Sequence, residues 1–317
     1  MLGVLTTCRD GLPEGLGPMG VLTTCKIRIS DAASNAFGWL QRNFSGLFDA
    51  MADALEVLID AILALLQQPP NTGWLYDLRR SEIDYLYPPA WHPFLMTAIF
   101  VALAWWLHRG WRMPVLIAVG LLFIINQGYW SAMTESLTLV LAACVVCMGI
   151  GVPIGIAAAH RPRLYAWMRP VLDLMQTLPT FVYLIPAIVF FGIGMVPGLI
   201  ATVIFVLPAP IRLTHLGISS TPTALTEAAD AFGATPRQKL WKVELPYATP
   251  QIMAGLNQTI MLSLSMVVIA ALVGADGLGV PVVRALNQVN TGLGFESGLI
   301  IVVVAILLDR LLRVNRR

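Results

Sequence analysis

Apolar segments close to the length of a membrane-spanning helix fill most of this chain beyond residue 92. A spanning helix needs roughly 20 mostly apolar residues, and seven stretches approach that length: 93–107, 113–130, 136–159, 170–191, 198–215, 255–275 and 297–312. Only 12% of the 317 residues are charged, about half the share found in an ordinary soluble domain. We therefore expect an all-α integral membrane protein with about seven transmembrane helices.

The chain before residue 93 has a different pattern. Within the segment Gly46–Leu66, four acidic residues recur at the spacing of one helix face: Asp49, Asp53, Glu56 and Asp60. Apolar residues fill most other positions, which predicts an amphipathic helix that packs against its own protein and does not cross the bilayer. We expect residues 1–45 to form a poorly ordered tail and residues 46–92 to contain this helix and a loop.

Basic residues are distributed unevenly between the loops. They follow the first, third, fifth and last apolar stretches, whereas the loops Gln127–Glu135 and Gly192–Gly198 contain no Lys or Arg. Because short loops rich in Lys and Arg stay in the cytoplasm, we expect the N-terminus outside and the C-terminus in the cytoplasm. The net charge is only +2, so no nucleic-acid partner is expected.

A polar segment interrupts the apolar pattern between residues 217 and 254, on the side predicted to be cytoplasmic. Thr221-Pro222 is typical of a helix start, and Gly233 suits a left-handed helix end. Thr235 and Gln238 have the spacing of a capping box, and Leu245-Pro246 is expected to end that second helix. The segment therefore predicts two short helices joined at Gly233, a compact unit able to transmit a movement.

This segment also resembles the EAA loop of ABC importer permeases, the cytoplasmic element that docks onto the ATP-hydrolysing subunit. The resemblance lies in Glu-Ala-Ala, a following Gly and a final Leu-Pro at the spacing of that loop, and Phe232 is a candidate anchor. It implies that the residues that couple this chain to the ATPase subunit are Glu227, Ala228, Ala229, Phe232, Gly233, Leu245 and Pro246.

Stretches on both sides of the loop resemble the permease of glycine betaine/proline betaine ABC importers. The matching segments are LDLMQTLPTFVYLIPAIVFFGIG (172–194), IFVLPAPIRLTHLGI (204–218) and NQTIMLSLSMVVIAALVGADGLG (257–279). The resemblance implies a type I importer permease fold for residues 93–317 in the bacterial cytoplasmic (inner) membrane, with residues 217–254 as the coupling loop. Related systems for choline, carnitine and trimethylamine N-oxide share these motifs, so the resemblance leaves the exact osmolyte open.

The same resemblance implies a set of partners. We expect a second copy of this permease as a homodimer partner, two copies of an ABC ATPase subunit, an extracytoplasmic substrate-binding protein and membrane lipid. ATP and Mg²⁺ would bind the ATPase, so we expect no cofactor on this chain and no enzymatic activity of its own.

Neutral polar side chains in two apolar stretches are candidates for the translocation path. They are Gln176, Thr180 and Tyr183 in the first stretch, and Asn257, Gln258, Met261, Ser263 and Ser265 in the second. A betaine carries a fixed cation and a carboxylate without net charge, so its path needs moderate polarity and no buried counter-ion. For any single one of these residues, helix-to-helix hydrogen bonding is an equally good explanation.

Three alternatives remain. The cargo of an ABC permease could be an amino acid such as methionine, or the chain could be an ATP-independent osmosensing channel, which has no reason to keep an EAA-like loop. A membrane enzyme is less well supported, because the glycines of Gly274–Gly279 do not follow a strand as in a nucleotide-binding motif. The histidines also lack metal-ligand spacing.

Overall fold

The computed structural model of the chain describes residues 6–8, 25–27, 29–67 and 91–312. It divides into two compact units, Met1–Met51 and Ala52–Arg317. In the first unit, strands β1 (Thr6–Cys8) and β2 (Cys25–Ile27) pair antiparallel with Cys8 opposite Cys25. Residues 1–5, 9–24 and 28 of the tail predicted to be poorly ordered, and the loop predicted after the amphipathic helix, lie outside the described residues.

Helix α2 (Ile29–Gln67) begins in the first unit and ends in the second. Its start corrects the prediction, because residues 29–45 are helical and do not belong to a tail. Asp31 lies in the first turn of the helix, where a negative charge stabilises the exposed N–H groups. Phe44 has non-helical backbone angles (φ −124°, ψ 19°), so a kink lies close to the predicted helix start.

Within the second unit, the last part of α2 packs through its apolar face. Ile59 is buried in a cluster with Ala142, Ala143 and Leu199, and the Gln67 side-chain amide donates a hydrogen bond of 2.9 Å to Thr134 Oγ1. The acidic residues Asp53, Glu56 and Asp60 are exposed. The amphipathic segment therefore packs against its own protein, as predicted for it.

The rest of the second unit is helical. In chain order its elements are α4 (Trp91–His108), α5 (Arg112–Asn126), α6 (Trp130–His160), α7 (Pro162–Thr177), α8 (Thr180–Phe191), α9 (Met195–Val206), α10 (Pro208–Ser219), α11 (Thr223–Ala231), α12 (Pro236–Lys239), the π-helical turn η2 (Leu240–Glu244), α13 (Leu245–Ala271), α14 (Gly279–Gln288) and α15 (Thr291–Leu312).

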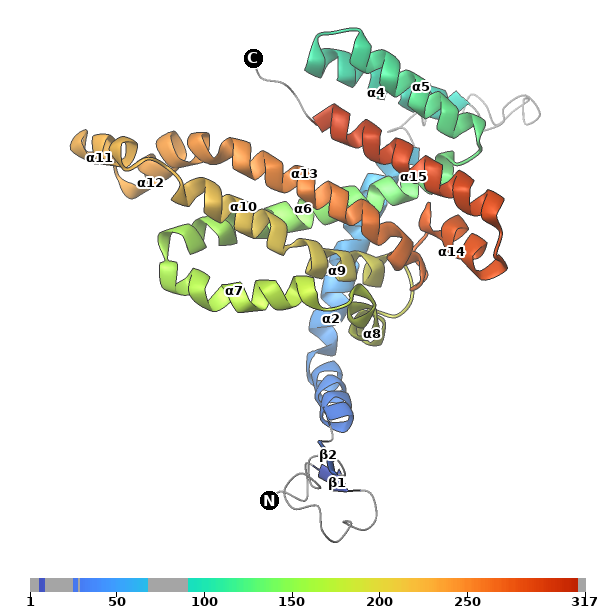
Figure 1. Cartoon of the computed structure of the whole chain (residues 1–317), viewed down its shortest axis with the longest axis horizontal. Helices are drawn as coiled ribbons and strands as arrows, with labels where there is room; N and C mark the ends of the chain where they lie inside the picture. Colours follow the sequence, from blue (N-terminus) through green and yellow to red (C-terminus); the bar gives the residue numbers. More distant parts are fainter. Residues whose placement is uncertain (1–5, 9–24, 28, 68–90, 313–317) are drawn as a thin grey trace. The chain divides into compact units, whose positions relative to one another are not determined.

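Helices α6, α10 and α13 lie against one another at the centre of the second unit (Figure 1). Glycines allow the close approach. A Cβ added to Gly155 of α6 would lie 2.6 Å from Thr214 Cβ of α10, and one added to Gly217 of α10 would lie 2.9 Å from Ala248 Cβ of α13. In lipid, van der Waals contact between closely packed backbones is a main source of helix association. These glycines therefore set the spacing of the three helices.

Four helices or helix pairs of the described chain are long and apolar enough to cross a membrane: Trp130–His160, Met195–Ser219, Pro236–Ala271 and Thr291–Leu311. The bent pair α7 and α8 would make a fifth span, and α4 and α5 are shorter apolar helices. The structure therefore supports four or five spans of full length, fewer than the seven expected, because two of the seven stretches fold into short helices and another is broken.

The broken stretch is the one predicted over 170–191. Helix α7 ends at Thr177, α8 begins at Thr180, and the two are bent by 96°. Leu178 and Pro179 have extended backbone angles (ψ 136° and 132°), as expected where a proline restricts the residue before it and removes a backbone donor. The bend at Pro179 therefore makes two helices out of one predicted span.

The chain after α13 turns back through the segment Gly274–Gly279. Gly277 has a φ of 122°, and a Cβ at this position would collide with Ser136 of α6. The Ser136 hydroxyl accepts a buried hydrogen bond of 2.7 Å from the Leu278 backbone N–H. The glycines of this segment therefore serve a tight turn that is joined to α6.

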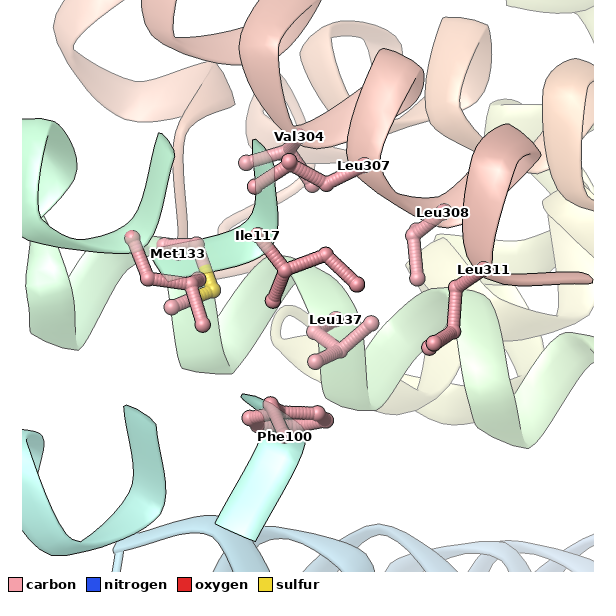
Figure 2. Close-up of a pocket in the computed structure, with 9 residues that line it drawn as sticks. Phe100, Ile117, Met133, Leu137, Val304, Leu307, Leu308 and Leu311 are labelled. Carbon is pink, nitrogen blue, oxygen red and sulfur yellow. The ribbon is translucent and has the colours of Figure 1, made fainter. Parts of the chain in front are cut away.

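A small cavity of about 40 Å³ lies between α4, α5, α6 and α15 (Figure 2). Its lining is apolar: Phe100, Ile117, Leu121, Met133, Leu137, Val304, Leu307, Leu308 and Leu311. A zwitterionic osmolyte would find no hydrogen-bond partner there. This cavity is therefore part of the helix packing and not a candidate for the translocation path.

The close approach of α6 and α10 generates a stability prediction. Replacing Gly155 with Ala should lower the free energy of unfolding by about 1–3 kcal/mol, because the added methyl group forces the two helices apart. Gly149 is the matched control, since it lies in the same helix and an added Cβ would meet nothing within 4 Å. Thermal unfolding of the detergent-solubilised protein measures both, and equal melting temperatures for the two variants would contradict the packing argument.

Candidate coupling segment and polar helix faces

The segment predicted to contact the ATPase folds as a short helix, a turn and the start of a long helix. We call residues Thr223–Glu244, which comprise α11, α12 and η2, the coupling segment. In Figure 1, α11 and α12 lie beyond the ends of α10 and α13. The Thr235 hydroxyl accepts from the Gln238 N–H, and the Gln238 side chain accepts from the Thr235 N–H. The predicted capping box is therefore present.

Gly233 joins the two helical parts in the predicted left-handed conformation, with a φ of 72°. Its N–H donates to the carbonyl of Asp230 at 2.9 Å, and the Ala234 N–H donates to that of Ala229 at 3.0 Å. These bonds satisfy carbonyls at the end of α11. Asp230 and Lys239 form an ion pair across this turn, with the Lys239 ammonium 2.9 Å from both carboxylate oxygens.

Two local predictions for this segment are wrong. Helix α11 begins at Thr223 with Pro222 as its N-cap residue and no side-chain cap, so Thr221 does not cap it. Pro246 does not end the second helix, because α13 continues from Leu245 to Ala271. The π-helical turn before Pro246 accommodates the proline. The Leu245 N–H bonds to the Leu240 carbonyl, five residues back, so the helix is wider at the position of Pro246.

The outer face of the coupling segment is exposed. No residue of α11 is buried, and Glu227 and Ala228 are exposed while Ala229 is half-buried. Phe232 is 91% exposed and Trp241 63% exposed. Leu245 is half-buried and Pro246 exposed. Exposed aromatic side chains beside small residues are typical of a surface that another protein covers.

The inner face of the segment contacts the end of α6. His160 Nε2 lies 2.9 Å from the Glu244 carboxylate, and His160 Nδ1 lies 2.9 Å from the Ile156 carbonyl oxygen. Sequence reasoning missed this pair, because the two residues are 84 positions apart and no spacing along the chain links them. Two further contacts join α7 to α10: Arg212 donates to Asp173 at 2.7 Å, and Tyr165 stacks on His215 with ring centroids 3.6 Å apart.

The first group of predicted path residues does not share one helix face. Gln176 lies on α7, whereas Thr180 and Tyr183 lie on α8 beyond the 96° bend. The Tyr183 side chain is buried, and its hydroxyl donates to the Met175 carbonyl at 2.7 Å. That hydroxyl therefore joins α8 to the end of α7. For Tyr183, this observation favours the helix-packing explanation over contact with substrate.

The second group lies on two faces of α13. Gln258 and Ser265 are exposed and Met261 is half-buried, so this face is uncovered in a single chain. The Ser265 hydroxyl donates to the Met261 carbonyl at 3.2 Å. On the other face, Ser263 is buried and Asn257 half-buried, and Ser263 Oγ and Asn257 Oδ1 are buried atoms without a hydrogen-bond partner in the described protein.

Comparison with known proteins decides the family. The model of the family described as "Binding-protein-dependent transport system inner membrane component" matches residues 151–317, a range that contains the coupling segment and all the candidate path residues. The chain belongs to this family. It is therefore a multi-pass inner-membrane permease, a transport subunit of an ABC importer and not an enzyme, as the sequence predicted.

Two relatives cover most of this permease. It is 45% identical over 287 residues to the glycine betaine transport system permease protein OpuAB of Bacillus subtilis (strain 168), over 90% of this chain and 93% of the relative. It is 46% identical over 271 residues to the glycine betaine/carnitine transport permease protein GbuB of Listeria monocytogenes serotype 1/2a (strain 10403S), over 84% of this chain and 88% of the relative.

A solved structure supports the fold of this permease. An inward-facing conformation of the MetNI methionine ABC transporter matches with a TM-score of 0.51 and 24% sequence identity, over 62% of this chain and 98% of that chain. The predicted all-α type I importer permease fold is thereby confirmed. At this level of identity the match concerns the fold alone.

The conformation of Gly233 generates a prediction. Replacing Gly233 with Val should lower substrate uptake by the reconstituted transporter at least about fivefold, because a left-handed conformation costs a branched residue roughly 1–2 kcal/mol. No atom lies within 4 Å of an added Cβ, so backbone conformation alone is tested. Gly233→Asn is the control, since Asn tolerates this conformation. Equal uptake by the Val and Asn variants, at equal membrane levels, would contradict the prediction.

Proposed function

We propose that this permease carries a trimethylated-amine osmolyte into the cell, with ATP hydrolysed by a partner subunit. The observation that most strongly supports this cargo is the 45% identity, over 90% of the chain, to a permease named for glycine betaine. The second relative is named for glycine betaine and carnitine. Candidate cargoes are therefore glycine betaine, proline betaine, choline, carnitine and trimethylamine N-oxide.

The charge distribution of the described helices favours the candidate cargoes without net charge over choline, which is a cation. Helix α13 contains no Asp, Glu, Lys or Arg between Leu245 and Ala271, and its polar side chains are neutral amides and hydroxyls. Asp173 and Arg212 form an ion pair with each other, so neither of them is an unpaired charge that could bind a charged cargo. A cargo without net charge needs only neutral partners along its path.

The path itself is proposed along the uncovered face of α13. Gln258, Met261 and Ser265 lie there, and Asn257 and Ser263 provide the unpartnered polar atoms behind it. Gln176 and Thr180, at the bend between α7 and α8, are half-buried candidates for the same path. Tyr183 is a weaker candidate because its hydroxyl is bonded within the chain.

The proposed complex contains two copies of this chain, two ATPase subunits and one extracytoplasmic binding protein. Apolar side chains left exposed on α7 and α8 support a second copy: Trp167, Val171, Leu174, Phe181 and Ile185. The coupling segment is proposed to enter the ATPase through Phe232 and the Glu227–Ala229 surface. ATP and Mg²⁺ then bind the ATPase, the chain itself holds no cofactor, and the N-terminus lies outside with the C-terminus in the cytoplasm.

Uptake by the reconstituted complex tests the cargo. Proteoliposomes that contain the permease, its ATPase and its binding protein should accumulate at least one of the five trimethylated or betaine compounds, only when ATP is present. Methionine is the comparison cargo. Uptake of methionine alone would refute the osmolyte assignment, and uptake that does not require ATP would favour the channel alternative.

Exposure of Phe232 generates a prediction for the partner. Replacing Phe232 with Ala should weaken binding of the ATPase to the detergent-solubilised permease about tenfold or more, since a buried aromatic anchor is worth roughly 2 kcal/mol at an interface. Phe295→Ala is the matched control, because Phe295 is also highly exposed, at 76%, and lies outside the coupling segment. Equal loss of binding in both variants would show that Phe232 is not an anchor.

A further inference from the structure

A buried carboxylate lies between the coupling segment and α6. Among the described residues, Glu244 is the only acidic or basic residue that is buried, with 7% of its surface exposed. A charge in such a position is costly unless a partner compensates it. The partner is His160, the last residue of α6, whose side chain is 46% exposed.

The geometry of this pair requires a shared proton. The Ile156 carbonyl oxygen can only accept a hydrogen bond, so the hydrogen bond to it at 2.9 Å places a proton on His160 Nδ1. His160 Nε2 then faces a Glu244 oxygen at 2.9 Å, and two lone pairs cannot bond at this distance. One further proton must therefore lie between them, either on Nε2 or on the carboxyl group.

The place of the pair gives it a mechanical role. Glu244 is the last residue of the π-helical turn η2, where the coupling segment continues into α13. Such turns are less regular than α-helix and frequently lie at functional sites. A displacement of the coupling segment therefore reaches α13 through the backbone and α6 through the Glu244–His160 contact.

The neighbouring charged groups have other partners or positions. On α10, Arg212 bonds to Asp173 and His215 stacks on Tyr165. In the coupling segment, Lys239 bonds to Asp230, and Lys242 is exposed. The remaining charges near the end of α6 are the exposed side chains Arg161, Arg163 and Arg169 in and before α7, and α13 and α9 carry none. His215 of α10 serves as a control, because its ring stacks on Tyr165 and forms no bond with this pair in the described protein.

We propose that the Glu244–His160 hydrogen bond is the positioning contact that transmits movement of the coupling segment to α6. The proposal rests on the coupling role proposed above for the same segment. It predicts that loss of this contact lowers the amount of substrate carried per ATP hydrolysed, while ATP hydrolysis itself continues.

The test measures uptake and ATP hydrolysis together in the reconstituted complex. Glu244→Gln keeps a hydrogen bond to the imidazole, because a glutamine amide can donate to Nε2 or accept from it, so uptake per ATP should remain close to that of the unaltered protein. His215→Gln should also leave uptake per ATP unchanged, because it does not touch this contact.

A second variant removes the contact without leaving a buried unpaired charge. The double substitution His160→Leu with Glu244→Met replaces the pair with apolar groups, a change that folded proteins usually tolerate. We expect uptake per ATP to fall about tenfold, the size expected for one hydrogen bond to a charged group. ATPase binding should remain, because Phe232 and the rest of the outer surface are unchanged.

The outcomes separate this inference from the proposed function. Unaltered uptake per ATP in the double variant, or an equal loss of uptake per ATP in the Glu244→Gln variant, would overturn the inference. If Gly233→Val also transports normally, the coupling role of the whole segment fails. If Gly233→Val loses transport while the double variant keeps it, only the Glu244–His160 inference fails.

Discussion

The close approach of α6, α10 and α13 is the constraint on which the rest of the second unit depends. Gly155 and Gly217 bring backbones so near that no Cβ fits between them, and a lipid environment makes such contact the main source of helix association. Helix α9 and the end of α2 then pack on α6. The same three helices carry the elements relevant to function, since α6 ends at His160 and α13 begins directly after the coupling segment.

The coupling segment combines an ordered backbone with an uncovered surface. Its order comes from short-range interactions: the capping box at Thr235, the left-handed Gly233 and the Asp230–Lys239 ion pair. Its connection to the transmembrane helices is continuous, because the π-helical turn carries the chain past Pro246 without a break. A segment of this kind can move as one piece. Two connections join it to the transmembrane helices: the continuous backbone into α13 and the contact of Glu244 with His160 of α6.

The polar residues of the apolar helices divide into two sets once the structure is known. The Tyr183 hydroxyl donates to a carbonyl of α7, so it serves helix packing. Thr202 and Thr259 are fully buried and donate to carbonyls within their own helices. Gln258 and Ser265 lie on a face of α13 that a single chain leaves uncovered. Neutral polarity on an uncovered face suits a cargo without net charge, and the apolar cavity between α4 and α15 does not.

The sequence by itself determined the class of protein and the local features of the coupling segment. Apolar stretches require helices in lipid, and caps such as Thr235 and the left-handed Gly233 depend only on residues a few positions away. Tertiary structure decided the rest: the division of the stretch 170–191 at Pro179, the passage of α13 through Pro246, and the pairing of His160 with Glu244. These three features depend on which helices, distant in the sequence, pack against one another, and the spacing of residues along the chain does not specify that packing.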